Sequence, residues 1–212
     1  LQYSPMAVPT ISGLPPLRWL DVAGTATATD DGVLTMVTGK QTDWFNPPPG
    51  EGMPAGLANA PVLVFDPPDA DWQLSVRVAV EHAYLFDAGT LFVHQGKDDW
   101  CKVCFEYSPE KKPTVVSVVT RGVSDDANGQ IIDGTAVHLR VSKAGPVIAF
   151  HYSTDGGAYW TLHRIFCMRD PKAPMTAGFL AQAPAPTGET CTAAFSNIKF
   201  EQRTLADPRN GE

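Results

Sequence analysis

The chain has 212 residues, a length that suits one large all-β domain better than two small ones. Its net charge of −7 argues against nucleic acid as a partner, because neutralising phosphates requires a dense basic patch. No apolar run approaches the roughly 20 residues that cross a bilayer, so no membrane partner is expected either.

The chain opens on a proline-rich stretch, and we expect an extended arm over residues 1–16. The first residue is Leu1 rather than methionine, as in a processed or trimmed chain, which favours a secreted or lumenal location over the cytoplasm. A weak strand is predicted over residues 17–21. A stronger one follows over residues 32–38, introduced by an Asp-Asp-Gly turn.

A long segment rich in proline, glycine and alanine, residues 46–59, comes directly after Trp44 and Phe45. Its three consecutive prolines exclude a helix and a central strand, and a loop of this length is typical of a lid or a binding loop. Trp44 and Phe45 either line a ligand site or pin the loop to the core, and pinning is the more common role of such aromatics.

The rest of the chain reads as short strands separated by turns. Residues 60–65 form one, and residues 72–80 alternate apolar and polar side chains with a period of two. Further strands are predicted over residues 84–94, 100–107, 115–121, 137–142, 148–153, 160–168, 176–182 and 191–201. The glycines between residues 121 and 130 indicate a mobile loop.

No segment carries a helical period for more than a turn or two. Many short strands with glycine and proline turns are typical of a β-sandwich or barrel, and we predict an all-β sandwich. A single domain is expected to occupy residues 1–212, with a C-terminal tail over residues 202–212. Exposed sheet edges are compatible with a homodimer.

The four cysteines do not have the spacing or setting of a zinc site. Cys101 and Cys104 lie on one predicted strand and point to opposite faces, so they are badly placed to bond each other. Cys167 and Cys191 either form a disulfide or stay unpaired with the other two, and the sequence leaves both alternatives open.

Several short motifs between residues 30 and 200 resemble the bacterial and fungal family DUF1349, also called regulation-of-enolase-like. The spaced Trp100, Lys102 and Glu106 are the most specific of them. The resemblance implies a concanavalin A-like jelly roll of two curved antiparallel sheets, and it implies a fold more firmly than a function. The sequence departs from the family pattern at Cys101, Cys104 and Asp126. The matching motifs are Thr42-Asp43-Trp44-Phe45, Asp87-Ala-Gly89-Thr-Leu-Phe-Val93, Trp100-Cys-Lys102 with Glu106, Val118-Val119-Thr120-Arg121, Ser124-Asp125, Ser153-Thr-Asp155-Gly156-Gly157, Pro186-Thr-Gly188 and Phe195-Ser-Asn-Ile198.

Strand alternation over residues 100–107 predicts a working face. The core side should carry Cys101, Val103, Phe105 and Tyr107, and the opposite side Trp100, Lys102, Cys104 and Glu106. In a jelly roll, a face that is both polar and aromatic is normally the concave groove that takes ligands. The same parity on other strands adds Arg77, His94, Arg140, His151, and either Thr120 or Arg121.

Classical glycoside hydrolysis is disfavoured, because it needs two carboxylates on either side of the bond and this strand offers only Glu106. A partner from Asp43 or Asp87 has no support in the pattern. The paired aspartates at 98–99 and 125–126 read as turn residues, so no metal is expected. No phosphate-binding or dinucleotide motif is present, and no cofactor is expected.

Two hypotheses remain, both with a small-molecule ligand. The first is a non-hydrolytic enzyme such as a cyclase, lyase or pericyclase of the Diels–Alderase type in secondary metabolism. In it, Lys102 and Arg121 polarise the substrate, Glu106 acts as general acid or base, and Trp44, Phe45 and Trp100 shape the site. Additional ligand contacts are expected from Tyr84, His94, Thr120, Arg140 and His151.

The second hypothesis is a lectin-like carbohydrate-binding or regulatory protein without catalysis. A deep pocket closed by residues 47–49 would favour the enzyme, and a shallow open trough would favour glycan binding. In the non-functional interpretation, Lys102 and Glu106 are a pair of charges on a solvated face. Isolated histidines, likewise, are more often surface or hydrogen-bonded residues than catalysts.

Overall fold

The computed structural model describes residues 8–212, which form strands and no helix. None of these residues belongs to a helix long and apolar enough to cross a membrane. The first half of the chain contains β1 (Arg18–Trp19), β2 (Thr25–Ala28), β3 (Leu34–Thr38), β4 (Trp44–Phe45), β5 (Leu57–Ala58), β6 (Val62–Phe65), β7 (Trp72–Val80) and β8 (Ala88–Gly96). The second half contains β9 (Asp99–Tyr107), β10 (Pro113–Arg121), β11 (Val123–Ile131), β12 (Ala136–Ala144), β13 (Val147–Ser153), β14 (Thr161–Cys167), β15 (Thr176–Gln182) and β16 (Cys191–Glu201).

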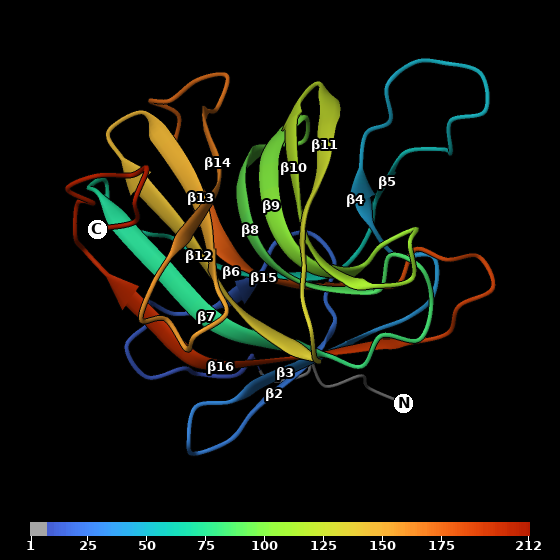
Figure 1. Ribbon diagram of the computed structural model, residues 1–212, viewed down its shortest axis with the longest axis horizontal. Coiled ribbons are helices and arrows are strands. Elements are labelled where there is room, and N and C mark those ends of the chain that lie inside the picture. Colours follow the sequence, from blue (N-terminus) through green and yellow to red (C-terminus); the bar gives the residue numbers. More distant parts are fainter. Residues whose placement is uncertain (1–7) are drawn as a thin grey trace.

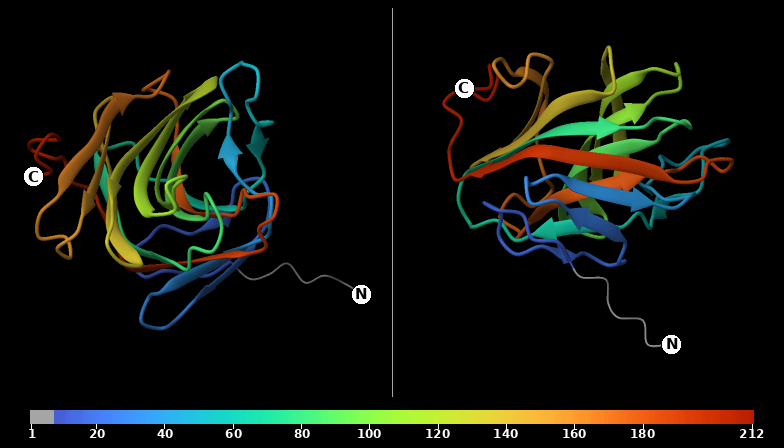
Figure 2. Two further views of the ribbon diagram at one scale, coloured as in Figure 1. Left: turned by 45° about the vertical axis from the view of Figure 1, so that its right-hand side comes forward. Right: turned by 90° about the horizontal axis from the view of Figure 1, so that it is seen from below.

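Two large antiparallel sheets pack face to face, which confirms the all-β sandwich (Figures 1 and 2). The first sheet, here called sheet A, has the order β1-β6-β15-β8-β9-β10-β11. The second, sheet B, has the order β14-β13-β12-β7-β16-β3-β2. The short pair β4-β5 belongs to neither sheet and stands beside the strands β9 to β11 of sheet A (Figure 1).

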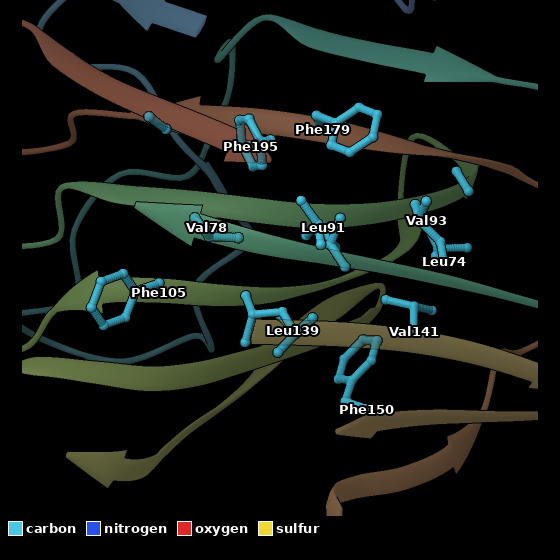
Figure 3. Packing of buried hydrophobic residues seen from close by; sticks show 14 of the residues in the cluster. Leu74, Val78, Leu91, Val93, Phe105, Leu139, Val141, Phe150, Phe179 and Phe195 are labelled. Carbon is cyan, nitrogen blue, oxygen red and sulfur yellow. The ribbon is translucent and has the colours of Figure 1, made fainter. Parts of the chain in front are cut away.

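The core lies between the inner faces of the two sheets and is built from the alternating apolar residues of both (Figure 3). On β9, Cys101, Val103 and Phe105 belong to this core, and Trp100 and Cys104 belong to two smaller clusters outside it. The predicted parity of β9 is therefore confirmed. Each fully buried Val, Leu or Phe side chain contributes about 1.5–3 kcal/mol, so the alternation fixes which face of β9 turns outward.

The predicted mobile loop over residues 121–130 is wrong, because this segment forms β11 at the edge of sheet A. Most β11 side chains are exposed, so the segment lacks the apolar alternation that identifies a half-buried strand. Its backbone ladder with β10 makes it a strand instead, with Asp126 opposite Val118. The short strands β2 and β5 were not predicted either, because β2 alternates only threonine with alanine and β5 has two residues.

The four cysteines are unpaired, which resolves the alternative that the sequence left open. Cys101, Cys104 and Cys191 are buried, whereas Cys167 is exposed. Part of the predicted arm, residues 1–7, lies outside the described residues. Beyond it, Ile11 is buried and Val8 and Leu14 pack against the core, so residues 8–14 lie on the body.

Candidate functional site

The outer face of sheet A gathers polar side chains from strands that are distant in the sequence. Glu106 on β9 stands opposite Ala88 on β8, which stands opposite Gln182 on β15. Lys102 on β9 stands opposite Val118, which in turn stands opposite Asp126 on β11. Because directly paired residues project to the same face of a sheet, all four polar side chains lie on the side away from the core.

One half of this face is covered by Trp44. Its ring centroid lies 5.0 Å from that of Phe92, 5.7 Å from Trp100 and 5.8 Å from His94, all in edge-on geometry. Its indole nitrogen donates to the carbonyl of Ala60 at 2.9 Å. Trp44 therefore pins the base of the proline-rich segment to the sheet, and Trp100 and His94 pack against it. Neither Trp100 nor His94 lines the cavity described next.

The other half of the face is the floor of a cavity of about 650 Å³. The base is mostly polar and consists of Asp43, Lys102, Val118, Glu106, Asp126 and Gln182. The walls are mostly apolar and come from residues 41–59, from Phe86 and from residues 184–186: Phe45, Pro54, Ala55, Leu57, Phe86, Pro184, Ala185 and Pro186, with the polar Gln41 and Asn59.

A chain of hydrogen bonds runs across this base. The Lys102 ammonium donates to Asp43 Oδ1 at 2.9 Å and to Gln182 Oε1 at 2.7 Å. The Gln182 amide donates in turn to Glu106 Oε2 at 3.3 Å and to the backbone carbonyl of Phe86 at 3.1 Å. Gln182 thereby fixes the positions of Lys102 and Glu106 relative to each other. One ammonium hydrogen of Lys102 remains for a ligand.

Burial determines the protonation of these groups. The pKa of Glu106 is raised to about 8, mainly by burial; Lys102 opposes this shift, and Asp126 and Asp43 add to it. Burial alone would lower the pKa of Lys102, but Asp43, Cys104 and Glu106 outweigh it and raise that pKa. At neutral pH the base of the cavity therefore holds an ammonium and, at Glu106, a mostly neutral carboxylic acid that can donate a hydrogen bond.

Of the residues predicted for the site, Lys102, Glu106 and Phe45 line the cavity. Thr120 is buried and shares a hydrogen bond of 2.8 Å with Ser124, whose hydroxyl accepts from the backbone of Asn46. It therefore fastens the loop instead of lining the cavity. Arg121 is exposed at the end of β10, donates to the Cys167 carbonyl and lies outside the cavity. Tyr84 is exposed in the turn before β8, also outside it.

Arg140 and His151 do not share this face, and neither does Arg77. Their strands, β12, β13 and β7, belong to sheet B. Arg140 stacks 4.3 Å from the ring of Trp160 and donates to the Gly211 carbonyl, and His151 bonds the Pro208 carbonyl at 2.8 Å. Both lie under the C-terminal tail. The expectation of a common face is wrong for these residues, because alternation along one strand does not say which sheet the strand joins.

Most cavity residues were not proposed from the sequence as site residues, among them Asp43, Phe86, Asp126 and Gln182. Asp43 was considered only as a second carboxylate for hydrolysis, and Asp126 only as a departure from the family pattern. Gln182 ends an apolar strand, where its amide gave no functional signal. Asp87, the other carboxylate considered, is buried in a turn, where its Oδ2 accepts from the backbone of Ala83 and Tyr84.

The sequence matches a family model described as "Protein of unknown function (DUF1349)" over residues 19–203. The chain belongs to the DUF1349 family. This membership confirms the resemblance in the motifs above. No curated protein was found to match the sequence.

Solved structures similar to this DUF1349 protein share its jelly-roll sandwich. A functionally unknown protein from Saccharomyces cerevisiae has a TM-score of 0.76 at 20% identity, covering 89% of this chain and 97% of that chain. Carbohydrate binding module CBM66 from Bacillus subtilis has a TM-score of 0.53 at 15% identity, covering 92% and 98%. A xylan β-1,4-xylosidase from Bacillus halodurans has a TM-score of 0.61 at 11% identity, and the match covers 80% of this chain but only 33% of the enzyme.

At these identities the likenesses show the fold and no more. Within residues 8–212, no group of three or more His, Cys, Asp or Glu side chains is placed to hold a metal ion.

Proposed function

We propose that this DUF1349 protein binds a small saccharide, or the end of a glycan chain, in the cavity on sheet A. The observation that carries the proposal is the buried Lys102–Gln182–Glu106 network at the base of an apolar-walled cavity. Lys102 is 2% exposed and Glu106 is 6% exposed. Charged and amide groups so deeply buried are costly to retain, and a polar ligand would make use of the hydrogen bonds that they still offer.

The chemistry of the cavity suits a sugar ring. Hydroxyl groups both donate and accept, and the base provides donors at Lys102 and protonated Glu106 and acceptors at Asp43 and Asp126. The C–H faces of the ring would pack on apolar walls such as Phe45 and Leu57. The names of two structural neighbours, a carbohydrate binding module and a xylosidase, support this ligand class.

The shape of the cavity favours a small saccharide or a chain end over an internal stretch of polysaccharide. Its volume of about 650 Å³ is that of a small-molecule site. Pro54 and Ala55 bound it on one side and Pro184 and Pro186 on another. Residues 47–49 do not line the cavity, so they do not form the lid that was expected for an enzyme.

A second candidate function adds chemistry at the same place. Glu106, with a pKa of about 8, could exchange a proton near neutral pH beside the Lys102 ammonium, which suits a general acid or base. A non-hydrolytic enzyme of the cyclase, lyase or pericyclase kind would use this pair on a bound substrate. This candidate is favoured only if turnover is found.

The test is isothermal titration of the protein with xylobiose, arabinose and glucose, and in parallel with the apolar metabolites indole and geraniol. We expect a saccharide to bind, and Lys102→Met to weaken it roughly tenfold or more because a hydrogen bond from a charged group is lost. Arg121→Ala, outside the cavity, is the control and should bind as the native protein does. Binding of the apolar compounds alone, or saccharide binding that Lys102→Met leaves intact, would overturn the proposal.

A further inference from the structure

The turn that precedes β8 holds an aromatic residue in a conformation that favours glycine. The backbone N–H of Asp87 donates to the carbonyl of Tyr84 at 3.2 Å, which closes a four-residue turn. Phe86 is the third residue of this turn and has a φ of 70°. A positive φ at this position is the mark of a type II turn, where glycine or asparagine is usual because a Cβ is disfavoured in the left-handed region.

The surrounding structure holds this strained residue from both sides. The Phe86 N–H donates to the Tyr107 carbonyl at 2.8 Å, and the Phe86 carbonyl accepts from the Gln182 side chain at 3.1 Å. The Asp87 carboxylate accepts from two further backbone N–H groups, those of Tyr84 in the turn and of Ala83 just before it. Strain of this kind persists only where neighbours over-determine the backbone, and it clusters at ligand sites.

Packing in the core does not explain why a phenyl ring occupies this position. Phe86 is 38% exposed, and it is one of the residues that line the cavity. Its backbone is joined through Gln182 to Lys102, so ring and polar base belong to one connected unit. A glycine would adopt this turn without strain, so the turn itself does not require phenylalanine. The phenyl ring therefore needs another explanation, such as contact with a ligand.

We propose that Phe86 is a ligand-contact residue whose ring packs on the apolar C–H face of a bound sugar ring. The hydroxyl groups of the same sugar ring would reach Lys102 and Glu106. The inference rests on the proposed function and narrows the ligand class to cyclic sugars with one accessible apolar face. An acyclic polyol such as sorbitol offers the same hydroxyl groups without a rigid face and should bind more weakly.

A second residue provides a matched control. Lys111 also has a positive φ, 57°, and its N–H donates to the Ser108 carbonyl at 2.8 Å in an exposed turn. Lys111 does not line the cavity. The same substitutions at the two positions therefore separate the effect of backbone strain from the effect of the ring.

The experiment compares Phe86→Ala, Phe86→Gly and Phe86→Tyr with Lys111→Ala and Lys111→Gly, by thermal unfolding and by titration with xylobiose, glucose and sorbitol. At both positions the glycine variant should melt a few degrees above the alanine variant, the reverse of the usual order, because glycine relieves the strain. Phe86→Ala and Phe86→Gly should bind the saccharides roughly five- to tenfold more weakly. Phe86→Tyr, which keeps an aromatic ring, should restore most of the binding that Phe86→Ala loses. Both Lys111 variants should bind as the native protein does.

The outcomes separate this inference from the proposed function. If the native protein binds a saccharide and Phe86→Ala binds it equally well, the role of Phe86 is overturned and the proposed function stands. The role of Phe86 is likewise overturned if sorbitol binds as tightly as the cyclic sugars. If the native protein binds none of the saccharides, both are overturned. A Phe86→Gly variant that melts below Phe86→Ala would contradict the strain on which the inference is based.

Discussion

The ammonium of Lys102 lies 2.9 Å from the carboxylate of Asp43, although 59 residues separate them in the sequence. The Lys102 side chain is 2% exposed and the Asp43 side chain 17%. The pair joins the central strand β9 to the start of the segment that forms one wall of the cavity. It therefore connects the polar base of the site to the wall that shapes it.

Removing Asp43 should destabilise the protein strongly. Asp43→Ala leaves a buried ammonium without its counter-charge, which costs about 3–5 kcal/mol in comparable buried pairs. Lys102→Met should cost less, because methionine is apolar and the remaining carboxylate is nearer to solvent. Urea unfolding of both variants and of the double variant measures the coupling between the two residues.

The exposed pair of Arg18 and Asp66, also joined by a short contact of 2.8 Å, provides the control. Its side chains are 46% and 70% exposed, so Asp66→Ala should cost less than about 1 kcal/mol. Equal losses for Asp43→Ala and Asp66→Ala would show that burial does not set the strength of the Lys102–Asp43 pair.

Glu106 should make the protein less stable as the pH rises above neutral. Its pKa is about 8 in the folded protein and 4.5 without the fold, so between these values the folded state holds a proton that the unfolded chain has lost. The contribution of Glu106 to the free energy of unfolding is largest below pH 4.5. It decreases as the pH rises toward 8, by at most about 1.4 kcal/mol per pH unit.

Glu106→Gln should remove this slope, because an amide keeps the shape of the neutral acid and does not titrate. The measurement is the free energy of unfolding in urea at pH 7, 7.5 and 8. Histidines still titrate slightly near pH 7, but they do so in both proteins, so the difference between the two pH profiles isolates Glu106. Parallel pH profiles for the native protein and Glu106→Gln would mean that the carboxyl is already ionised at neutral pH.

The sequence was sufficient to predict the outward face of β9 but not its partners. Alternation with a period of two placed Trp100, Lys102 and Glu106 on one side, since a slip of one residue would expose Val103 and Phe105. Asp43 and Gln182 are 59 and 80 residues away from Lys102, and local periodicity carries no information on which strands become neighbours. Because periodicity does not show which sheet a strand joins, Arg140 and His151 were assigned to the wrong face.

The β11 segment shows a second limit. Its side chains are mostly exposed, so nothing in their order distinguishes a polar edge strand from a loop. The backbone ladder that makes it a strand is formed with β10 and not by its own side chains. Asp126 was therefore recognised as a cavity residue only from the structure. The same holds for Phe86, because no pattern in the sequence reveals its left-handed backbone conformation.

Acid should loosen the C-terminal tail. Burial, with help from Arg140, lowers the pKa of His151 to about 4, and the ring bonds the Pro208 carbonyl. A histidine with a lowered pKa contributes stability above pH 6.5 that is lost as the pH falls toward 4. Hydrogen exchange of the Arg209 and Gly211 amides should therefore quicken between pH 6.5 and 4.5, after correction for intrinsic rates. In His151→Leu this extra acceleration should be absent; if it persists there, another group holds the tail.

Trp44 and Phe45 are adjacent in the sequence, but substituting Trp44 should mainly reduce stability and substituting Phe45 should mainly reduce binding. Trp44 is buried among Phe92, Trp100 and His94, so Trp44→Ala opens a hole and should cost about 3–5 kcal/mol of stability. Phe45 is only partly buried and lines the cavity, so Phe45→Ala should cost less than about 2 kcal/mol and should weaken saccharide binding instead. Trp44→Phe, which keeps an aromatic ring but loses the bond to Ala60, should fall between the native protein and Trp44→Ala in stability. Urea unfolding and titration with xylobiose on the same samples measure both effects. A Phe45→Ala variant that loses as much stability as Trp44→Ala, with unchanged binding, would show that both residues serve only to pin the loop.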